Sequence, residues 1–356
     1  MAAARPSDGS SVADYDYDLP TGLVAKYPAA RRDGSRLLVL PPQGAVEHRR
    51  FSDVVDLFER GDVLVVNESM VFPARLLGRK ATGAEAEILL LRPTPDDSDG
   101  LVWEALARPG RKLRPGSTVI VGDDLEVEIL DSTPTGSRVV RLVTDLTSEE
   151  ALERHGQVPL PPYIDRRPEP LDRERYQTVY ARERGSVAAP TAGLHFTYDL
   201  LDRLEAKGVG RAAVTLHVGI GTFRPVEVDD PNDHEMHSEW YSVSEQAAEA
   251  INAARADGGR VWAVGTTAVR TLETVARADG SVCAGAGETE LFIRPPYVFK
   301  AVDGLITNFH LPRSTLLMLV ASLGGYHRTR TAYAEAVAQR YRFYSYGDAM
   351  AVLPRL

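Results

Sequence analysis

Five segments decide the fold of the middle of this chain: EILLLRP (87–93), LVWEALARP (101–109), STVIVG (117–122), LEVEIL (125–130) and SRVVRLV (137–143). Each segment is short and rich in apolar and β-branched residues. Turn-forming clusters separate them, such as PTPDDSDG (93–100) and TPTG (133–136), and no long helical pattern intervenes. Short strands at this spacing are typical of a small antiparallel barrel. We therefore predict an inserted β-barrel domain over residues 75–144.

On both sides of this block, strand patterns alternate with helix patterns. Buried strands are predicted at 36–40, 62–67, 261–264 and 304–309, and helices at 198–207, 245–256, 268–277 and 315–323. Ser244 and Ser314 precede two of these helices as N-caps, and Thr147 and Glu150 have the spacing of a capping box. The fold class is therefore α/β (α+β), with a discontinuous catalytic domain over 15–74 and 145–356. Residues 1–14 are small and polar, so we expect a disordered tail there.

Composition narrows the class of protein. The chain has 356 residues, 44% of them hydrophobic, which is enough for a sizeable core. Its single cysteine, Cys283, excludes an internal disulfide and a thiolate metal site and fits a reducing compartment. No apolar run is long enough to span a bilayer, and the first residues lack a signal-peptide pattern. The sequence thus predicts a cytoplasmic protein, and the net charge of −9 argues against a generic nucleic-acid coat.

Two segments carry the densest chemistry, RERGSVAAPTAGLHFT (182–197) and TLHVGIGTFRPV (215–226). They combine small residues and hydroxyls with His195, His217 and Arg224. Glycine and alanine leave room for backbone to approach a ligand, while threonine and histidine supply polar contacts. The pattern predicts a ligand-binding wall.

Common nucleotide and metal motifs do not fit these segments. HVGIGTF (217–223) lacks the third glycine of a dinucleotide fingerprint, and the chain contains no P-loop pattern. His234 and His237 are spaced H-x-x-H, which differs from the zincin H-E-x-x-H, so a zinc site is not favoured. Glu235 and Glu239 are better interpreted as hydrogen-bonding or acid/base groups.

Two strand-to-helix turns are further candidates. The turn Gly265-Thr266-Thr267 has two interpretations. It either presents unpaired helical N–H groups that bind an anion or carboxylate, or it is a structural turn in which Thr266 is the N-cap. Asn308 and His310 follow a buried strand, at the carboxyl edge where α/β sheets usually bind ligands. The aromatic segment YRFYSY (341–346) is either a base-stacking platform or, by our preference, docked core.

The densest basic cluster lies in the predicted barrel. Arg108, Arg111, Lys112 and Arg114 have no acidic residue between them. Such a cluster is either a solvated turn or a contact for a phosphate backbone.

Many of these segments, in order, resemble the S-adenosylmethionine:tRNA ribosyltransferase-isomerases of queuosine biosynthesis. The resemblance runs from about Tyr15 to the C-terminus, and several matching runs exceed ten residues. The segments that carry it are DLPTGLVAKYP, SRLLVL, PARLLGRK, GQVPLPPYI, ERYQTVYARERGSVAAPTAGLHFT, TLHVGIGTFRPV, HEMHSEWY, VGTTAVRTLE, VDGLITNFHLPRSTLLMLV and YRFYSYGDAM.

The resemblance implies an enzyme that uses S-adenosylmethionine as a ribosyl donor. The acceptor would be 7-aminomethyl-7-deazaguanine at the tRNA wobble position, and the products epoxyqueuosine-tRNA, adenine and methionine. No metal and no separate cofactor are expected, and the partners would be tRNA and the donor, with the chain a monomer or weak homodimer.

The resemblance also suggests roles for particular residues. Proton-transfer candidates are His195, His217, His237, His310 and Glu235. Substrate-binding candidates are Thr191, Gly193, Phe196, Gly219, Gly221, Thr222, Arg224, Thr266, Arg270, Asn308 and Ser314. Arg108, Arg111, Lys112 and Arg114 are the tRNA-binding candidates.

One segment departs from the family pattern. Asn67-Glu68-Ser69-Met70 stands where the family usually has Asn-Asp-Thr-Arg, so Met70 replaces a cation. Two alternatives therefore stay open. One is a paralogue that transfers the same ribosyl group to a different acceptor, such as a free deazapurine. The other is a non-catalytic tRNA-binding protein, which would have little need for the histidine-bearing loops.

Overall fold

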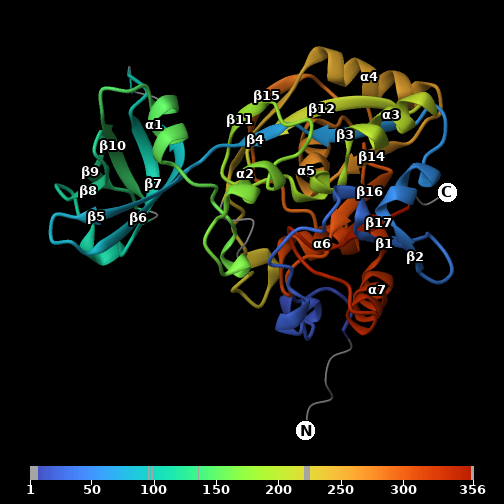
Figure 1. The fold of residues 1–356 in the computed structure, drawn as a ribbon. Helices are drawn as coiled ribbons and strands as arrows, with labels where there is room; N and C mark the ends of the chain where they lie inside the picture. The colour runs from blue at the N-terminus through green and yellow to red at the C-terminus, as the bar shows by residue number, and fades with distance from the viewer. Residues whose placement is uncertain (1–6, 95–96, 98, 135, 220–224, 354–356) are drawn as a thin grey trace, which may run out of the picture.

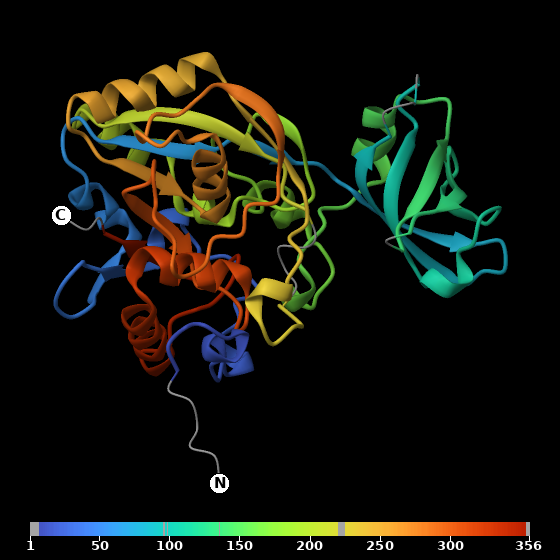
Figure 2. The ribbon, with the colours of Figure 1, turned by 180° about the vertical axis from the view of Figure 1, so that it is seen from behind.

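The computed structural model describes residues 7–94, 97, 99–134, 136–219 and 225–353. It contains a large mixed sheet covered by helices and a separate closed barrel, joined by two lengths of chain that run side by side (Figures 1 and 2). The predicted mixed α/β class with a small antiparallel barrel is confirmed.

Nine described strands form the main sheet, in the order β15-β13-β12-β3-β14-β16-β17-β1-β2. The neighbours β12, β3, β14 and β16 are parallel to one another, so their carboxyl ends meet at one edge. The strands are β1 (Arg36–Leu40), β2 (Glu47–Arg50), β3 (Val63–Asn67), β12 (Gly210–Leu216), β13 (Glu239–Val243), β14 (Val261–Val264), β15 (Gly285–Thr289), β16 (Gly304–Asn308) and β17 (Ala349–Val352).

The central strands are buried on both faces, which explains their continuous apolar sequences. Val65 and Leu305 point into one core with the helices α4, α5, α6 and α7, while Leu64 and Ile306 point into another with α3. The helices are α1 (Ser148–His155), α2 (Pro170–Arg175), α3 (Tyr198–Ala206), α4 (Glu245–Ala256), α5 (Thr266–Val275), α6 (Thr315–Gly324) and α7 (Tyr326–Ala338). Short 3₁₀ turns are η1 (Val12–Tyr15), η2 (Thr21–Leu23), η3 (Arg32–Gly34), η4 (Phe51–Leu57), η5 (Gly110–Lys112), η6 (Pro162–Ile164), η7 (Thr191–His195) and η9 (Pro231–Asp233).

The barrel closes in the order β10-β7-β6-β5-β8-β9. Its strands are β5 (Arg75–Lys80), β6 (Glu85–Pro93), β7 (Val102–Arg108), β8 (Thr118–Gly122), β9 (Leu125–Ser132) and β10 (Arg138–Val143). Helix α1 follows the predicted boundary at residue 144, and its apolar residues Ala151 and Leu152 lie in the same apolar cluster as the barrel core.

Two chain segments connect the barrel to the main body. Arg75 and Gln157 exchange both backbone hydrogen bonds, at 3.1 and 2.8 Å. Beside them, a Cβ on Gly156 would lie 2.0 Å from the carbonyl oxygen of Pro73. Only glycine therefore allows the outgoing and returning chains to approach so closely. A further pair, β4 (Ser69–Val71) with β11 (Glu183–Ser186), is parallel and lies on the side of the main body from which the connection leaves (Figure 1).

Most predicted caps form. The side chains of Thr147, Ser244 and Ser314 accept hydrogen bonds from the backbone N–H groups of Glu150, Ala247 and Leu317. The expected disorder of the N-terminal tail does not extend to its last residues, because Val12 in η1 is fully buried in the main core. Within the described part of the chain, no helix is both long and apolar enough to cross a membrane.

Candidate active site

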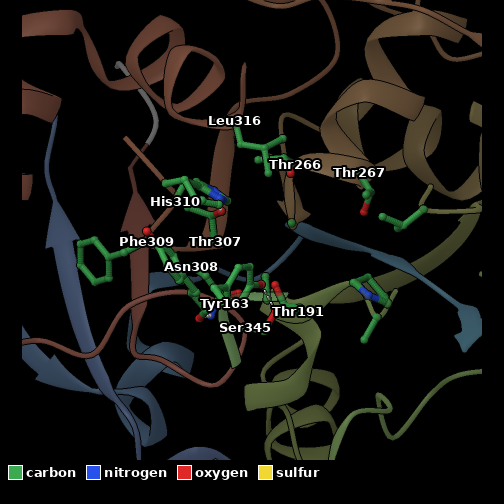
Figure 3. Close-up of a pocket in the computed structure, with 17 residues that line it drawn as sticks. Tyr163, Thr191, Thr266, Thr267, Thr307, Asn308, Phe309, His310, Leu316 and Ser345 are labelled. Carbon is green, nitrogen blue, oxygen red and sulfur yellow. Dashed lines mark hydrogen bonds between the residues drawn. The ribbon is translucent and has the colours of Figure 1, made fainter. Parts of the chain in front are cut away.

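A cleft opens at the carboxyl ends of β14 and β16, where two strand-to-helix connections diverge (Figure 3). Its volume is about 550 Å³, part of it open to solvent. The turn after β14 and the turn after β16 both contribute to its walls, together with the segment 189–192 that contains Thr191. Four of the predicted site residues therefore meet here: Thr191, Thr266, Asn308 and His310.

The turn after β14 presents the start of α5 to the cleft. Gly265, with φ of +86°, occupies the N-cap position, and Thr266 is the first helical residue. The interpretation of Thr266 as an N-cap is therefore wrong, because glycine alone adopts this φ without strain. No side chain caps this helix within the described chain, so its first N–H groups remain available to an anionic group.

Asn67 fixes this turn to the centre of the sheet. Its amide nitrogen donates to Thr267 Oγ1 at 3.1 Å and to the Leu216 carbonyl at 2.9 Å. Its oxygen accepts from the N–H groups of Ser69 and Leu216. The buried side chain thus ties β3 and β12 to the start of α5, which limits movement of the cleft wall.

His310 follows β16 into the cleft (Figure 3). Its Nε2 lies 2.8 Å from Thr307 Oγ1, and its backbone N–H donates to the Tyr333 hydroxyl. Burial lowers the pKa of His310 to about 3. The imidazole is therefore neutral near pH 7 and can exchange hydrogen bonds or a proton with a ligand.

His195 lies beneath this cleft, and in the described chain it lines a neighbouring cavity instead. Nδ1 is 2.8 Å from Ser35 Oγ, and Nε2 is 3.0 Å from Asn308 Nδ2. Phe51 stacks on the ring with centroids 4.9 Å apart. Burial lowers the pKa of His195 to about 3, with smaller contributions from the positive charges of Arg342 and Arg32. With both ring nitrogens engaged, His195 is placed to hold Asn308 and has no atom directed at the cleft.

A second cleft, about 980 Å³ in volume, shares Leu316 with the first. Glu235, His237 and Arg270 line it. Arg270 is one of the predicted substrate-binding residues, but it is buried and forms an ion pair with Glu239. Glu239 also accepts from the backbone N–H of Gly219 at 3.0 Å, so this pair fixes the start of the loop after β12.

His217 stands apart from both clefts in the described chain. It stacks on Trp240 with ring centroids 4.9 Å apart, and burial lowers its pKa. Its Nδ1 has no hydrogen-bond partner among the described residues.

Other predicted site residues serve the packing of the fold. Gly193 and Phe196 are buried in and after η7, where Phe196 meets Phe51 edge to face. Ser314 caps α6 and also donates to the Leu311 carbonyl. Gly221, Thr222 and Arg224 lie outside the described residues.

Several residues of the cleft were not predicted from the sequence. Thr307 binds His310, and Tyr163 and Ser345 line the opposite wall and hydrogen-bond to each other at 2.6 Å. Thr307 directly precedes Asn308, so its position was a usable signal. Ser345 lies within YRFYSY, whose aromatic residues Tyr341, Phe343 and Tyr346 are buried core, as we preferred. In the described chain, no group of three or more His, Cys, Asp or Glu side chains is arranged to hold a metal ion.

Known proteins match the chain over almost its full length. The profile of the family described as "Queuosine biosynthesis protein" matches residues 12–352. S-adenosylmethionine:tRNA ribosyltransferase-isomerase of Symbiobacterium thermophilum is 57% identical over 345 residues, which cover 96% of this chain and 99% of that protein. The chain belongs to the S-adenosylmethionine:tRNA ribosyltransferase-isomerase family.

Two further members support this assignment. The ribosyltransferase-isomerase of Moorella thermoacetica is 54% identical over 346 residues, 96% of this chain and 99% of its own. The crystal structure of S-adenosylmethionine tRNA ribosyltransferase from Thermotoga maritima is 38% identical, with a TM-score of 0.55, and covers 95% of this chain and 99% of that one.

The segment that departs from the ribosyltransferase-isomerase pattern lies at the side of the sheet that leads to the barrel. Glu68 is half-buried, and burial raises its pKa. Met70 in β4 is half-buried and pairs with Arg184 of β11. An arginine on the neighbouring strand thus stands beside the position at which the family pattern has its cation.

The basic cluster of this ribosyltransferase-isomerase extends from the barrel toward the main body. Arg111, Lys112 and Arg114 are exposed and form no ion pair with any described residue. Arg138 donates to the carbonyls of Leu113 and Gly110 and so holds their loop in place. Arg108 lines a cleft of about 1470 Å³ between barrel and main body, together with Arg166 and Arg167.

Proposed function

We propose that this enzyme transfers and isomerises the ribosyl group of S-adenosylmethionine onto 7-aminomethyl-7-deazaguanine in the wobble position of tRNA. The products are epoxyqueuosine-tRNA, adenine and methionine. One observation carries the proposal: the 57% identity to a ribosyltransferase-isomerase is measured over 345 residues, which are 96% of this chain and 99% of that protein.

The cleft at β14 and β16 suits the donor. The open start of α5 at Thr266 offers N–H groups to the carboxylate of the methionine moiety, since the helix N-terminus favours an anion. Thr191 adds a hydroxyl on the facing segment. Ala189, Pro190 and Leu316 provide apolar surface for a flat ring.

The chemistry of the donor requires proton transfers. Its sulfonium acidifies the adjacent 5′ carbon of the ribose, so a positioned base removes a proton there and leaves a carbanion. Breaking the bond to adenine requires a proton at the departing nitrogen, and breaking the bond to sulfur leaves neutral methionine. The aminomethyl nitrogen of the acceptor forms the new bond to the ribosyl group and loses a proton, while the bonds to adenine and to sulfur break, so the reaction balances without an external oxidant or reductant.

His310 is a candidate to carry one of these protons, because its imidazole lines the cleft. His237 and Glu235 line the adjoining cleft and are the candidates for the second proton transfer. Arg270 and Glu239 act by holding Gly219, and His195 acts by holding Asn308.

The barrel loop provides the tRNA contact. Arg111, Lys112 and Arg114 are free to bind phosphates, and Arg108 continues the positive charge toward the main body. Met70 gives one specific reason to keep a second candidate, the paralogue that uses a different acceptor such as a free deazapurine.

Adenine release separates these functions. The protein is incubated with S-adenosylmethionine and tRNA that carries the deazaguanine, and free adenine is measured by chromatography. Release with this tRNA supports the proposed function, whereas release only with a free deazapurine supports the paralogue. Binding of tRNA without adenine release under any of these conditions would contradict both and leave a tRNA-binding protein.

The roles of two histidines are tested in the same assay. We expect His310→Asn to lower adenine release by about two to four orders of magnitude, the usual contribution of general acid–base catalysis. His195→Ala should also lose turnover, because Asn308 loses its support. Full activity of either variant would remove that histidine from the proposed site.

A further inference from the structure

Asn308 has a buried hydrogen-bond acceptor that no described residue uses. The side chain is 2% exposed and lines the cleft, yet its Oδ1 has no hydrogen-bond partner among the described residues. Leaving a buried acceptor unpaired costs about 1–3 kcal/mol, so such atoms are rare in folded proteins. An unpaired acceptor at a ligand cleft is therefore a candidate for a ligand contact.

The orientation of this amide is fixed by its surroundings. Nδ2 lies 3.3 Å from the carbonyl oxygen of Tyr344 and 3.5 Å from that of Asp348. Both neighbours are acceptors only, so the group that faces them must be the NH₂ and not the oxygen. A flipped amide would place three oxygens together.

His195 completes this arrangement. Because Asn308 Nδ2 donates, His195 Nε2 must accept, and the ring proton then sits on Nδ1 and is donated to Ser35 Oγ at 2.8 Å. The lowered pKa of His195, about 3, is consistent with a neutral ring that can accept at Nε2. The contacts from Ser35 through His195 thus direct the NH₂ of Asn308 toward His195 and the carbonyls of Tyr344 and Asp348, and Oδ1 is left without a described partner on a residue that lines the cleft.

We propose that Asn308 Oδ1 accepts a hydrogen bond from the exocyclic amino group of a purine-type ring bound in the cleft, and that Ser35 and His195 are its positioning residues. The inference rests on the proposed function, which brings two such rings to the enzyme. One is the adenine of the donor, with its 6-amino group. The other is the deazaguanine of the acceptor, with its 2-amino group. The apolar surfaces of Ala189, Pro190 and Leu316 can pack against either ring.

The test compares ligands that carry this amino group with ligands that lack it; in the first pair an oxo group takes its place and N1 gains a proton, whereas in the second pair the amino group is simply absent. Affinity for S-adenosylmethionine and for its deaminated analogue, S-inosylmethionine, is measured by calorimetry with the full-length protein. In parallel, KM is measured for tRNA carrying 7-aminomethyl-7-deazaguanine and for tRNA carrying the analogue without the 2-amino group. For one of the two pairs, we expect the wild type to prefer the amino-bearing ligand by about ten- to a hundredfold.

The variant Asn308→Ala should reduce that preference to less than about twofold, because no side-chain acceptor remains to be satisfied. Loss of preference in the first pair assigns the contact to adenine, and loss in the second assigns it to the deazaguanine. A preference that survives in both pairs, or an equal weakening of all four ligands, would overturn the inference. Adenine release by the wild type tests the proposed function separately and can succeed when this inference fails.

His195→Phe tests the positioning role, since it keeps a ring against Phe51 and removes both nitrogens. We expect the same preference to fall while the thermal unfolding transition stays cooperative. Retention of the full preference in His195→Phe would overturn the positioning role of His195. The matched control is Ser244→Ala, which removes a capping hydrogen bond of α4 outside the cleft and should leave the preference unchanged.

Discussion

His195 and His310 are both buried and neutral, but they are engaged in different ways. His195 uses both ring nitrogens within the protein, whereas His310 has a protein contact at Nε2 and lines the cleft. Residue type alone therefore does not separate a positioning histidine from one that meets the substrate. The difference lies in which atoms are already occupied.

These two histidines make folding stability depend on pH. Their pKa values fall from the ordinary 6.5 to about 3, so the unfolded chain binds protons that the folded protein does not. Their contribution is complete above pH 6.5 and is lost as the pH falls toward 3. We expect the free energy of unfolding in urea to drop by about 2 kcal/mol for each histidine between pH 7 and pH 5.

Two buried aspartates, Asp62 and Asp172, do not contribute to the change in stability over this pH range. The pKa values of Asp62 and Asp172 are lowered from 3.8, so their contributions are lost only below that pH. The free energy of unfolding of the variant His310→Asn should therefore fall by about 2 kcal/mol less than that of the wild type over the same pH range. An identical fall in both proteins would show that His310 does not titrate as its burial requires.

The sequence predicted which residue types gather at the cleft, because the carboxyl ends of parallel strands share an edge. Thr266, Asn308 and His310 follow from that rule alone. The hydrogen-bond and ion-pair partners of the buried polar groups could not be predicted from the sequence. Glu239 pairs with Arg270, and Ser35 bonds to His195 across 160 positions, and no local pattern encodes such contacts.

At the scale of elements, the turn between β14 and α5 shows how backbone conformation shapes the site. Gly265 has φ of +86°, and this conformation aims the first turn of α5 into the cleft. A Cβ at this position would find space, with its nearest neighbours 3.6 Å away. Backbone strain is therefore the main cost of a substitution.

We expect Gly265→Ala to destabilise the protein by about 1–3 kcal/mol, because φ of +86° with ψ of 155° is a conformation that essentially only glycine adopts. Affinity for S-adenosylmethionine should fall as well, because the start of α5 shifts. The control is Gly258→Ala after α4, where φ is +82° and no atom lies within 4 Å of the added Cβ. Thermal unfolding should show a loss of stability for both variants, while calorimetry should show weaker donor binding only for Gly265→Ala. Equal donor affinity in both would contradict a role for this turn.

At the scale of the whole molecule, the exposed cations are divided between two bodies, and we expect tRNA to contact both. The variant in which Arg111, Lys112 and Arg114 are all changed to alanine should raise KM for tRNA. The slope of log KM against log salt should decrease by about 0.9 for each phosphate that the protein no longer neutralises. Donor affinity should not change, because the loop belongs to the barrel. The control is the double variant Arg49→Ala and Arg50→Ala on β2, at the opposite edge of the main sheet. An equal effect of both variants would indicate only a general charge effect.

The sequence pattern predicted most strands of the barrel, but it did not show which neighbouring elements pack on them. Turn clusters and short apolar runs gave five of its strands, but β5 was hidden within PARLLGRK, where charges and glycine interrupt the alternation. Helix α1 has an ordinary capped helical sequence, which says nothing about the body on which it packs. Assignment of such an element depends on tertiary contacts.

The paired backbone of Arg75 and Gln157 has a consequence for how such a molecule could arise and be rebuilt. The segment that begins at Arg75 and ends at Gln157 contains the whole barrel, and its two ends lie within hydrogen-bonding distance of each other. For the main domain, the insertion is therefore geometrically equivalent to a short loop. The main domain thus places almost no constraint on the structure of the domain inserted between these two residues. A different RNA-binding module could be grafted onto the same stem, and the tRNA preference could change while the donor cleft is preserved.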